Sequence, residues 1–148
     1  MAHSDKIVHI YTDGACKGNP GPGGWGAILK YGRDYKEING FEDNTTNNIM
    51  ELTGVIEALK SLKRPCCIII TTDSNYVKDG ITKWIESWKI NHWRTSNKKP
   101  VKNKELWVDL DNLCKLYKIQ WEWVKGHSGH PENEHADYLA NKAIEENL

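Results

Sequence analysis

The sequence predicts an α/β fold built on a five-stranded mixed sheet, in which three antiparallel strands are followed by two parallel additions and helices flank the sheet. Two observations carry this prediction. Three strand-like segments follow one another near the N-terminus with turn residues between them, as in an antiparallel meander. Helical and strand-like segments then alternate, and a crossover through a helix places successive strands parallel. The length fits a single domain over residues 1–148.

The N-terminal segments are predicted as three strands. Residues 6–12 form a β-branched and aromatic run that ends at Asp13, and the glycine-rich residues 14–24 follow as a loop. The segments 25–31 and 35–41 flank a short polar turn and are expected to pair as a hairpin.

The rest of the chain alternates between helices and strands. Apolar residues at helical spacing predict a helix over 47–62, and the continuous apolar run 66–72 is typical of a central strand buried on both faces. The remaining predicted elements are short helices over 74–80 and 82–90, a longer helix over 104–117, a strand over 119–125 and a last helix after residue 131.

Composition excludes several classes of protein. With 39% hydrophobic and 27% charged residues, the chain is neither disordered nor a coiled coil. No apolar run is long enough to span a membrane and no signal-peptide core is present, so we expect a soluble, cytoplasmic protein without membrane contact. Four cysteines lack metal-binding spacing, which favours reduced thiols over a zinc site.

The glycine-rich loop matches a dinucleotide-binding pattern only formally. Gly21, Gly23 and Gly26 have the required spacing, but a strand follows them where a helix is needed. No Gly-Lys-Ser/Thr sequence closes the loop as a P-loop would require. Two interpretations remain: a wide loop, or a backbone cradle for a phosphate or sugar.

Four carboxylates form the strongest functional pattern. Asp13 and Asp73 follow predicted strands, while Glu51 and Asp137 lie on the apolar faces of predicted helices. Each alone would suit a cap or a residue reaching toward water. Together, without equally inward cations, they predict a carboxylate cluster for two Mg²⁺ ions, the arrangement that catalyses phosphoryl displacement.

A histidine is the candidate for proton transfer. His127 lies in a Gly-His-Ser-Gly-His-Pro loop just before the last predicted helix, and its ordinary pKa of about 6.5 suits that role. The alternative is an ordinary surface histidine. His130 and His135 have weaker claims, because they also suit capping or solvent positions.

Charge is segregated although the 20 basic and 20 acidic residues cancel. Residues 78–104, the basic segment, contain eight basic and two acidic residues, interleaved with Trp84, Trp88 and Trp93. Basic and aromatic groups together are typical of a nucleic-acid interface. The alternative is a solvated helix whose tryptophans anchor it to the core.

These motifs, in order, resemble bacterial type 1 ribonuclease H from about residue 6 to 143. The matching sequences are Tyr11-Thr-Asp13-Gly, Gly18-Asn-Pro-Gly-Pro-Gly-Gly24, Thr45-Thr-Asn-Asn48, Met50-Glu51-Leu52, Thr72-Asp73-Ser74, Trp121-x-Trp-Val-Lys-Gly-His127-x-Gly-His-Pro-Glu-Asn-Glu134 and Asp137. The resemblance implies a ribonuclease H-like fold and an endonuclease that hydrolyses the RNA strand of RNA–DNA hybrids independently of sequence. It also implies 5′-phosphate and 3′-hydroxyl products, two Mg²⁺ ions with Mn²⁺ as a substitute, and a monomer.

The resemblance assigns roles to individual residues. Asp13, Glu51, Asp73 and Asp137 match the family's metal-binding carboxylates, and His127 matches its mobile histidine. It also implies hybrid contacts by Cys16, Gly18, Asn19, Asn47 and Asn48 at RNA 2′-hydroxyls, by Thr46 at a DNA phosphate, by Asn75 in the minor groove, and, in a basic protrusion over residues 81–102, by Trp84, Trp88, Lys89, Lys98, Lys99 and Lys102. Asn75 departs from the glutamine expected at its position.

Two other classes of protein share part of this pattern. A related two-metal enzyme, such as an integrase or exonuclease, would also carry acids at strand ends, but only RNA offers the 2′-hydroxyl that the amide-rich loops would contact. An inactive binding module would keep the basic segment and lose at least one acid. All four acids are present.

Overall fold

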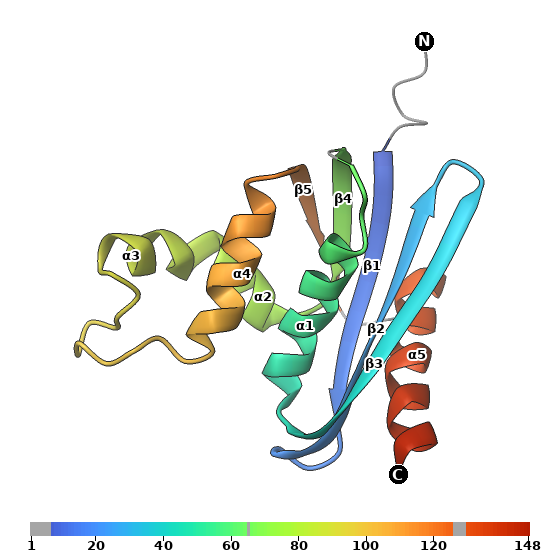
Figure 1. Cartoon of the computed structure of the whole chain (residues 1–148), viewed down its shortest axis with the longest axis horizontal. Helices are drawn as coiled ribbons and strands as arrows, with labels where there is room; N and C mark the ends of the chain where they lie inside the picture. The colour runs from blue at the N-terminus through green and yellow to red at the C-terminus, as the bar shows by residue number, and fades with distance from the viewer. Residues whose placement is uncertain (1–6, 65, 126–129) are drawn as a thin grey trace.

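A five-stranded mixed sheet forms the centre of the protein, here described from a computed structural model (Figure 1). The structure describes residues 7–64, 66–125 and 130–148. The strands lie in the order β3-β2-β1-β4-β5. Their bounds are β1 (Ile7–Cys16), β2 (Gly21–Tyr31), β3 (Asp34–Thr45), β4 (Cys67–Thr72) and β5 (Lys118–Trp123).

Strand pairing follows the predicted mixed pattern. β1 pairs with β2, and β2 with β3, in antiparallel orientation. β4 pairs in parallel with both β1 and β5, so its apolar residues lie at the interior of the sheet. The expected fold class and the central position of this strand are both confirmed.

Helices cover both faces of the sheet (Figure 1). Their bounds are α1 (Asn47–Lys60), α2 (Asn75–Asp79), the π-helical turn η2 (Gly80–Trp84), α3 (Ile85–Ile90), α4 (Lys104–Cys114) and α5 (Pro131–Asn147). Alternate residues of β2 show the two faces, because Gly23 lies against Met50 of α1 while Gly24 lies against Ala140 of α5. None of the helices in the described part of the chain combines the length and hydropathy needed to cross a lipid bilayer.

The main core lies between α1, α4 and the sheet. Leu52, Val55, Ile56 and Leu59 are buried at the spacing that predicted the helix, and they belong to one apolar cluster with residues of β1 and β4. Burying a side chain of this size stabilises the fold by about 1.5–3 kcal/mol. This packing fixes α1 beside the ends of β1 and β4, where the candidate site forms.

The glycine-rich stretch differs from its prediction as a loop over 14–24. β1 continues to Cys16 and β2 begins at Gly21, so only residues 17–20 connect them. Glycines of β2 pair with the end of β1 through their backbones, as in the register Cys16↔Gly23. Because glycine has no side chain, this part of the sequence shows no apolar alternation that would predict a strand. Asp13 therefore lies within β1, two residues beyond its last parallel partner, Tyr11↔Thr71.

The helical region after β4 also differs in detail. Two short helices were expected over 74–80 and 82–90, but α2, η2 and α3 follow one another without interruption from Asn75 to Ile90. Gly80 lies against the ring of buried Trp107, and a side chain larger than that of glycine would overlap this ring. The close contact places the π-helical turn directly on α4.

We predict opposite stability effects for two glycine-to-alanine substitutions. In Gly26→Ala the new Cβ would overlap the carbonyl oxygen of Ala136 and lie 2.7 Å from Leu139 Cβ, so we expect a loss of about 1–3 kcal/mol. In Gly54→Ala the nearest atom is 3.4 Å away, and higher helix propensity should add about 0.5–1 kcal/mol. Urea denaturation midpoints measure both changes. Equal effects of the two substitutions would contradict the close approach of β2 and α5.

Candidate active site

Three carboxylates from three different elements converge at one end of the sheet. Asp13 comes from β1, Glu51 from α1, and Asp73 directly follows β4. One carboxylate oxygen of each lies within 4.8 Å of the others. Asp13 is only 6% exposed, and the other two are half-buried. The predicted convergence of strand-end and helix-face acids is therefore present for these three.

Local backbone features bring α1 close to Asp13. A Cβ atom on Gly14 would lie 2.6 Å from the backbone nitrogen of Glu51, so only glycine allows this separation between strand and helix. Thr46 caps α1, because its hydroxyl accepts a hydrogen bond from the Ile49 N–H at 3.2 Å. Asn47 then donates to Glu51 Oε1 at 3.2 Å and orients that carboxylate.

Asp137 joins the site from the opposite face of the sheet. It lines the same cavity, of about 370 Å³, as the other three acids, and its carboxyl is hydrogen-bonded to Asp13. Asn141, one turn later on α5, donates to Asp137 Oδ1 at 3.2 Å and to its carbonyl oxygen at 2.9 Å. The carboxyl of Asp137 is thus held in a fixed orientation toward Asp13.

Burial and mutual repulsion raise the pKa of two of these acids. Burial is the largest cause for Asp13, whose pKa rises to about 9, and the hydrogen bond with Asp137 and the charge of Asp73 act in the same direction. Burial also raises the pKa of Glu51 to about 7, against a hydrogen bond from Ser74 that lowers it. The site therefore gathers more negative charge than its protein surroundings stabilise.

This donor set fits a hard divalent cation. All the converging groups offer carboxylate oxygens, which Mg²⁺ and Mn²⁺ prefer over the nitrogen and sulfur ligands typical of zinc. A bound cation would lower the pKa values that burial and repulsion raise. The residues that could hold it are Asp13, Glu51 and Asp73, with Asp137 adjacent.

The amide-bearing residues lie around the same cavity. Asn47, Asn48 and Asn75 line it together with the acids. Asn19 reaches this group from the β1–β2 connection, since its Oδ1 accepts a hydrogen bond from the Asn47 N–H at 2.9 Å. Residues far apart in the sequence are thereby joined beside the carboxylates.

The other predicted loop residues lie next to this junction. Cys16 Sγ is 3.4 Å from the carbonyl oxygen of Thr45, immediately before the capping residue Thr46. Gly18 has a positive φ of 76°, a conformation that favours glycine. The β1–β2 connection and the start of α1 therefore form one continuous surface.

Tyr76 lines the cavity, although no sequence pattern marked it as a candidate site residue. The hydroxyl of Tyr76 accepts hydrogen bonds from Asn103 Nδ2 and Trp107 Nε1, each at 3.0 Å. The available signal was position alone, because Tyr76 falls in the first turn after Asp73. Its two partners lie at least 27 residues away in the sequence, beyond any local pattern.

The three histidines have different outcomes. His127 lies outside the described residues, so its role stays a prediction. His130 immediately precedes α5 and makes no capping hydrogen bond through its side chain. His135 contacts the carboxylate of Glu37 on β3, and it is absent from the described lining of the cavity.

The basic segment combines anchoring and exposure. Trp84 and Trp88 are half-buried, and the Trp88 ring lies 5.4 Å from that of buried Trp107 on α4. The anchoring interpretation is therefore correct for Trp88. Lys98, Lys99 and Lys102 are exposed, whereas Lys89 forms ion pairs with acidic side chains.

Comparisons with known proteins agree with this geometry. The family model described as RNase H matches residues 5–145. Ribonuclease H of Bradyrhizobium diazoefficiens is 62% identical over 138 residues, which cover 93% of this chain and 90% of that protein. Ribonuclease H of Hydrogenovibrio crunogenus is 60% identical over 139 residues, covering 94% of this chain and 96% of the relative.

Solved structures show the same fold. LC9-RNase H1, a type 1 RNase H with the type 2 active-site motif, superposes with a TM-score of 0.84 and 34% identity, covering 97% of this chain and 74% of that one. LC11-RNase H1 in complex with an RNA/DNA hybrid gives a TM-score of 0.72 at 22% identity, covering 95% and 99%. The second likeness concerns the fold alone.

The raised pKa of Asp13 predicts a stability penalty in metal-free buffer. A raised acid pKa favours folding below the unfolded value near 3.8, and this contribution is lost as pH rises through about 9. At pH 7 in EDTA, Asp13→Asn should therefore melt about 2–4 °C above the parent protein, and millimolar Mg²⁺ should narrow the gap.

The matched control is Asp43→Asn, which removes one exposed charge on β3 and should leave the melting temperature nearly unchanged. Thermal unfolding followed by circular dichroism measures both variants. A lower melting temperature for Asp13→Asn than for the parent protein in EDTA would show that the acids do not destabilise one another.

Proposed function

The chain belongs to the RNase H family, and from that membership we propose that it is an endoribonuclease that hydrolyses the RNA strand of RNA–DNA hybrids. The observation that supports this most directly is the convergence of Asp13, Glu51 and Asp73 from three elements, with Asp137 beside them. Carboxylates that converge in this way suit phosphodiester hydrolysis assisted by divalent cations.

We assign the metal-binding role to these four acids, with two Mg²⁺ ions as the expected cofactor and Mn²⁺ as a substitute. Bound there, the cations would supply Lewis-acid stabilisation of phosphate oxygens and a more acidic water. The chain's own residues preorganise the ligands. Asn47 orients Glu51, Asn141 orients Asp137, and the close contact at Gly14 holds α1 against β1.

A separate group of residues is proposed to recognise the RNA strand. The 2′-hydroxyl both donates and accepts hydrogen bonds, and it distinguishes RNA from DNA without any reading of bases. Amide groups of Asn19, Asn47 and Asn48, with the backbone at Cys16 and Gly18, offer both kinds of partner beside the carboxylates. Cleavage should therefore be independent of sequence and leave 5′-phosphate and 3′-hydroxyl ends.

The DNA strand would lie along two further surfaces. Thr46 is proposed to contact a DNA phosphate at the start of α1, with Asn75 at the minor groove and the basic segment beyond it. Lys98, Lys99 and Lys102 are exposed and would contact phosphates, while Trp84 and Trp88 support the segment from the side of the core.

His127 is proposed to carry a proton during hydrolysis or product release. We further infer that one catalytic domain acts as a monomer.

Substrate selectivity and one substitution test the proposal together. With Mg²⁺, the protein should cleave the RNA strand of a hybrid and leave duplex RNA and duplex DNA intact, and EDTA should abolish cleavage. Glu51→Gln should lower kcat by about 1000-fold or more, because it removes a ligand charge without changing side-chain shape.

The matched control is Glu57→Gln on the same helix, whose side chain is 42% exposed and lies outside the cavity. Its rate should equal that of the parent protein. Cleavage of duplex DNA at a comparable rate, cleavage that resists EDTA, or full activity of Glu51→Gln would each contradict the proposal.

The exposed lysines should act on binding and leave the chemical step unchanged. Replacing Lys98, Lys99 and Lys102 together by alanine should raise KM several-fold with kcat nearly kept, since phosphate contacts contribute equally to the ground state and the transition state. The slope of log binding against log salt should fall by about 0.9 for each contact removed. A control that replaces Lys36, Lys63 and Lys118 has the same change in charge on other surfaces. An identical KM shift in both triple variants would assign the effect to net charge alone.

A further inference from the structure

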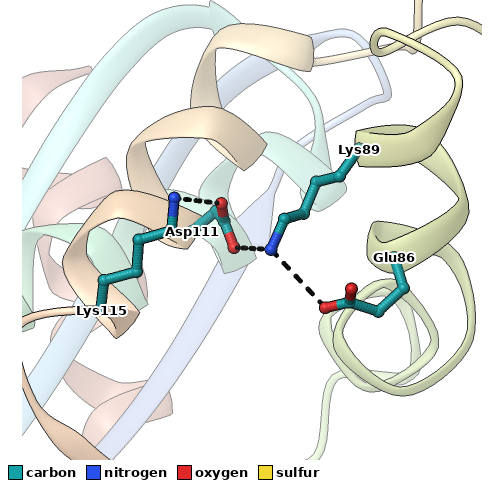
Figure 2. Close-up of polar contacts among 4 residues, drawn as sticks. All are labelled: Glu86, Lys89, Asp111 and Lys115. Carbon is teal, nitrogen blue, oxygen red and sulfur yellow. Dashed lines mark hydrogen bonds and ion pairs between the residues drawn. The ribbon is translucent and has the colours of Figure 1, made fainter.

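An ion-pair network joins α3, which lies within the basic segment, to α4 (Figure 2). Lys89 Nζ on α3 lies 3.4 Å from Asp111 Oδ1 on α4 and 3.6 Å from Glu86 Oε1 on its own helix. The second oxygen of Asp111, Oδ2, lies 3.4 Å from Lys115 Nζ. Asp111 therefore bridges two lysines, and one of them belongs to a different helix.

The central pair is shielded from solvent more than its neighbours. The side chain of Asp111 is 15% exposed and that of Lys89 33%, whereas Glu86 and Lys115 are 79% and 62% exposed. The carboxylate of Asp111 raises the pKa of Lys89, with a smaller effect from Glu86. An ammonium group between two carboxylates has its charge balanced within the protein, which leaves it poorly placed to bind a phosphate.

Lys89 lies at the point where the polypeptide leaves α3. Residues 91–103, the basic loop, begin two positions later and connect α3 to the start of α4. Within the loop, the Val101 N–H donates to the Trp93 carbonyl at 3.1 Å and the Thr95 N–H to the Lys99 carbonyl at 2.7 Å. These hydrogen bonds hold the backbone of the loop together. The orientation of the loop relative to the rest of the protein then depends on how the end of α3 packs on α4.

Aromatic packing alone leaves that direction incompletely fixed. The rings of Trp88 and Trp107 lie 5.4 Å apart and hold α3 against α4 through apolar contact, which is largely non-directional. The Lys89–Asp111 pair adds a contact between defined atoms one residue further along α3. It restrains the last turn of the helix, from which the basic loop departs.

We propose that Asp111 is a positioning residue for substrate binding, which through Lys89 fixes the orientation of the basic loop so that its exposed Arg94, Lys98, Lys99 and Lys102 meet the phosphates of one strand. This inference rests on the proposed function for its substrate. It also gives Lys89 a structural role in place of the direct phosphate contact that the family resemblance implied.

The alternative makes the opposite prediction for one variant. If Lys89 contacted phosphate, Asp111 would compete for its charge, and Asp111→Asn would free the lysine and lower KM. If Asp111 positions the loop, the same substitution should raise KM for a hybrid by about three- to five-fold, with kcat changed by less than about two-fold. Lys89→Gln should raise KM by a similar factor and leave the salt slope unchanged, whereas loss of a phosphate contact would lower that slope by about 0.9.

The double variant tests whether the two residues act through one contact. Lys89→Gln combined with Asp111→Asn should bind no more weakly than Asp111→Asn alone, since both substitutions remove the same pair. The matched control is Asp109→Asn on the same helix, which removes an equal charge 3.9 Å from Lys60 of α1 and away from α3. Its KM should stay at the parental value.

Amide hydrogen exchange gives a readout that needs no substrate. In Asp111→Asn, but not in Asp109→Asn, the amides of Thr95 and Val101 should exchange several-fold faster while those of β1 and β4 keep their rates. If the parent protein fails to cleave a hybrid, the proposed function is wrong, and hydrogen exchange still decides whether Asp111 orders the loop. Unchanged exchange, or a lower KM in Asp111→Asn, overturns the inference.

Discussion

The mutual repulsion of four carboxylates is the constraint on which the rest of this structure depends. Asp13, Glu51, Asp73 and Asp137 share one small cavity, and the pKa of Asp13 rises to about 9 because burial and neighbouring negative charge oppose its ionisation. Left to themselves, such groups would separate and reach water. The sheet prevents this, because β1 and β4 are paired in parallel up to the residues just before the acids. Strand pairing and core packing therefore hold together a group of acids that a bound cation would stabilise.

The convergence also depends on close contacts between helices and the sheet, which glycine makes possible. Gly14 allows α1 to approach β1 next to Asp13, and Gly24 and Gly26 allow α5 to approach β2 from the other face. Because Asp137 is carried on α5, the separation between that helix and the sheet sets its distance from Asp13. These glycines of β1 and β2 thus help to set the geometry of the candidate site.

Sequence reasoning succeeded where the signal was local. The apolar stripe of α1 and the continuous apolar run of β4 predicted both elements to within two residues at each end, and the four acids became candidates through their places beside such patterns. It failed where the determining contact was distant. The glycines of this stretch carry no side-chain alternation, so the extension of β1 past Asp13 was missed. Nothing in the sequence near Lys89 indicates that it also pairs with Asp111, 22 residues away.

The separation between the two halves of the site has a physical consequence. The carboxylates are fixed by the sheet and by α1 and α5, whereas the basic loop is fixed by the contact of α3 with α4. In the proposed function, a change at the second contact would alter where phosphates are held and leave the four carboxylates in place, because β1, α1 and α5 would not need to move. Affinity for the hybrid and the chemistry of cleavage can therefore vary independently. Among the basic residues of this region, Lys89 is paired with Asp111 of α4, while Lys98 and Lys99 are exposed. In the proposed arrangement the first orients the loop and the other two contact phosphates.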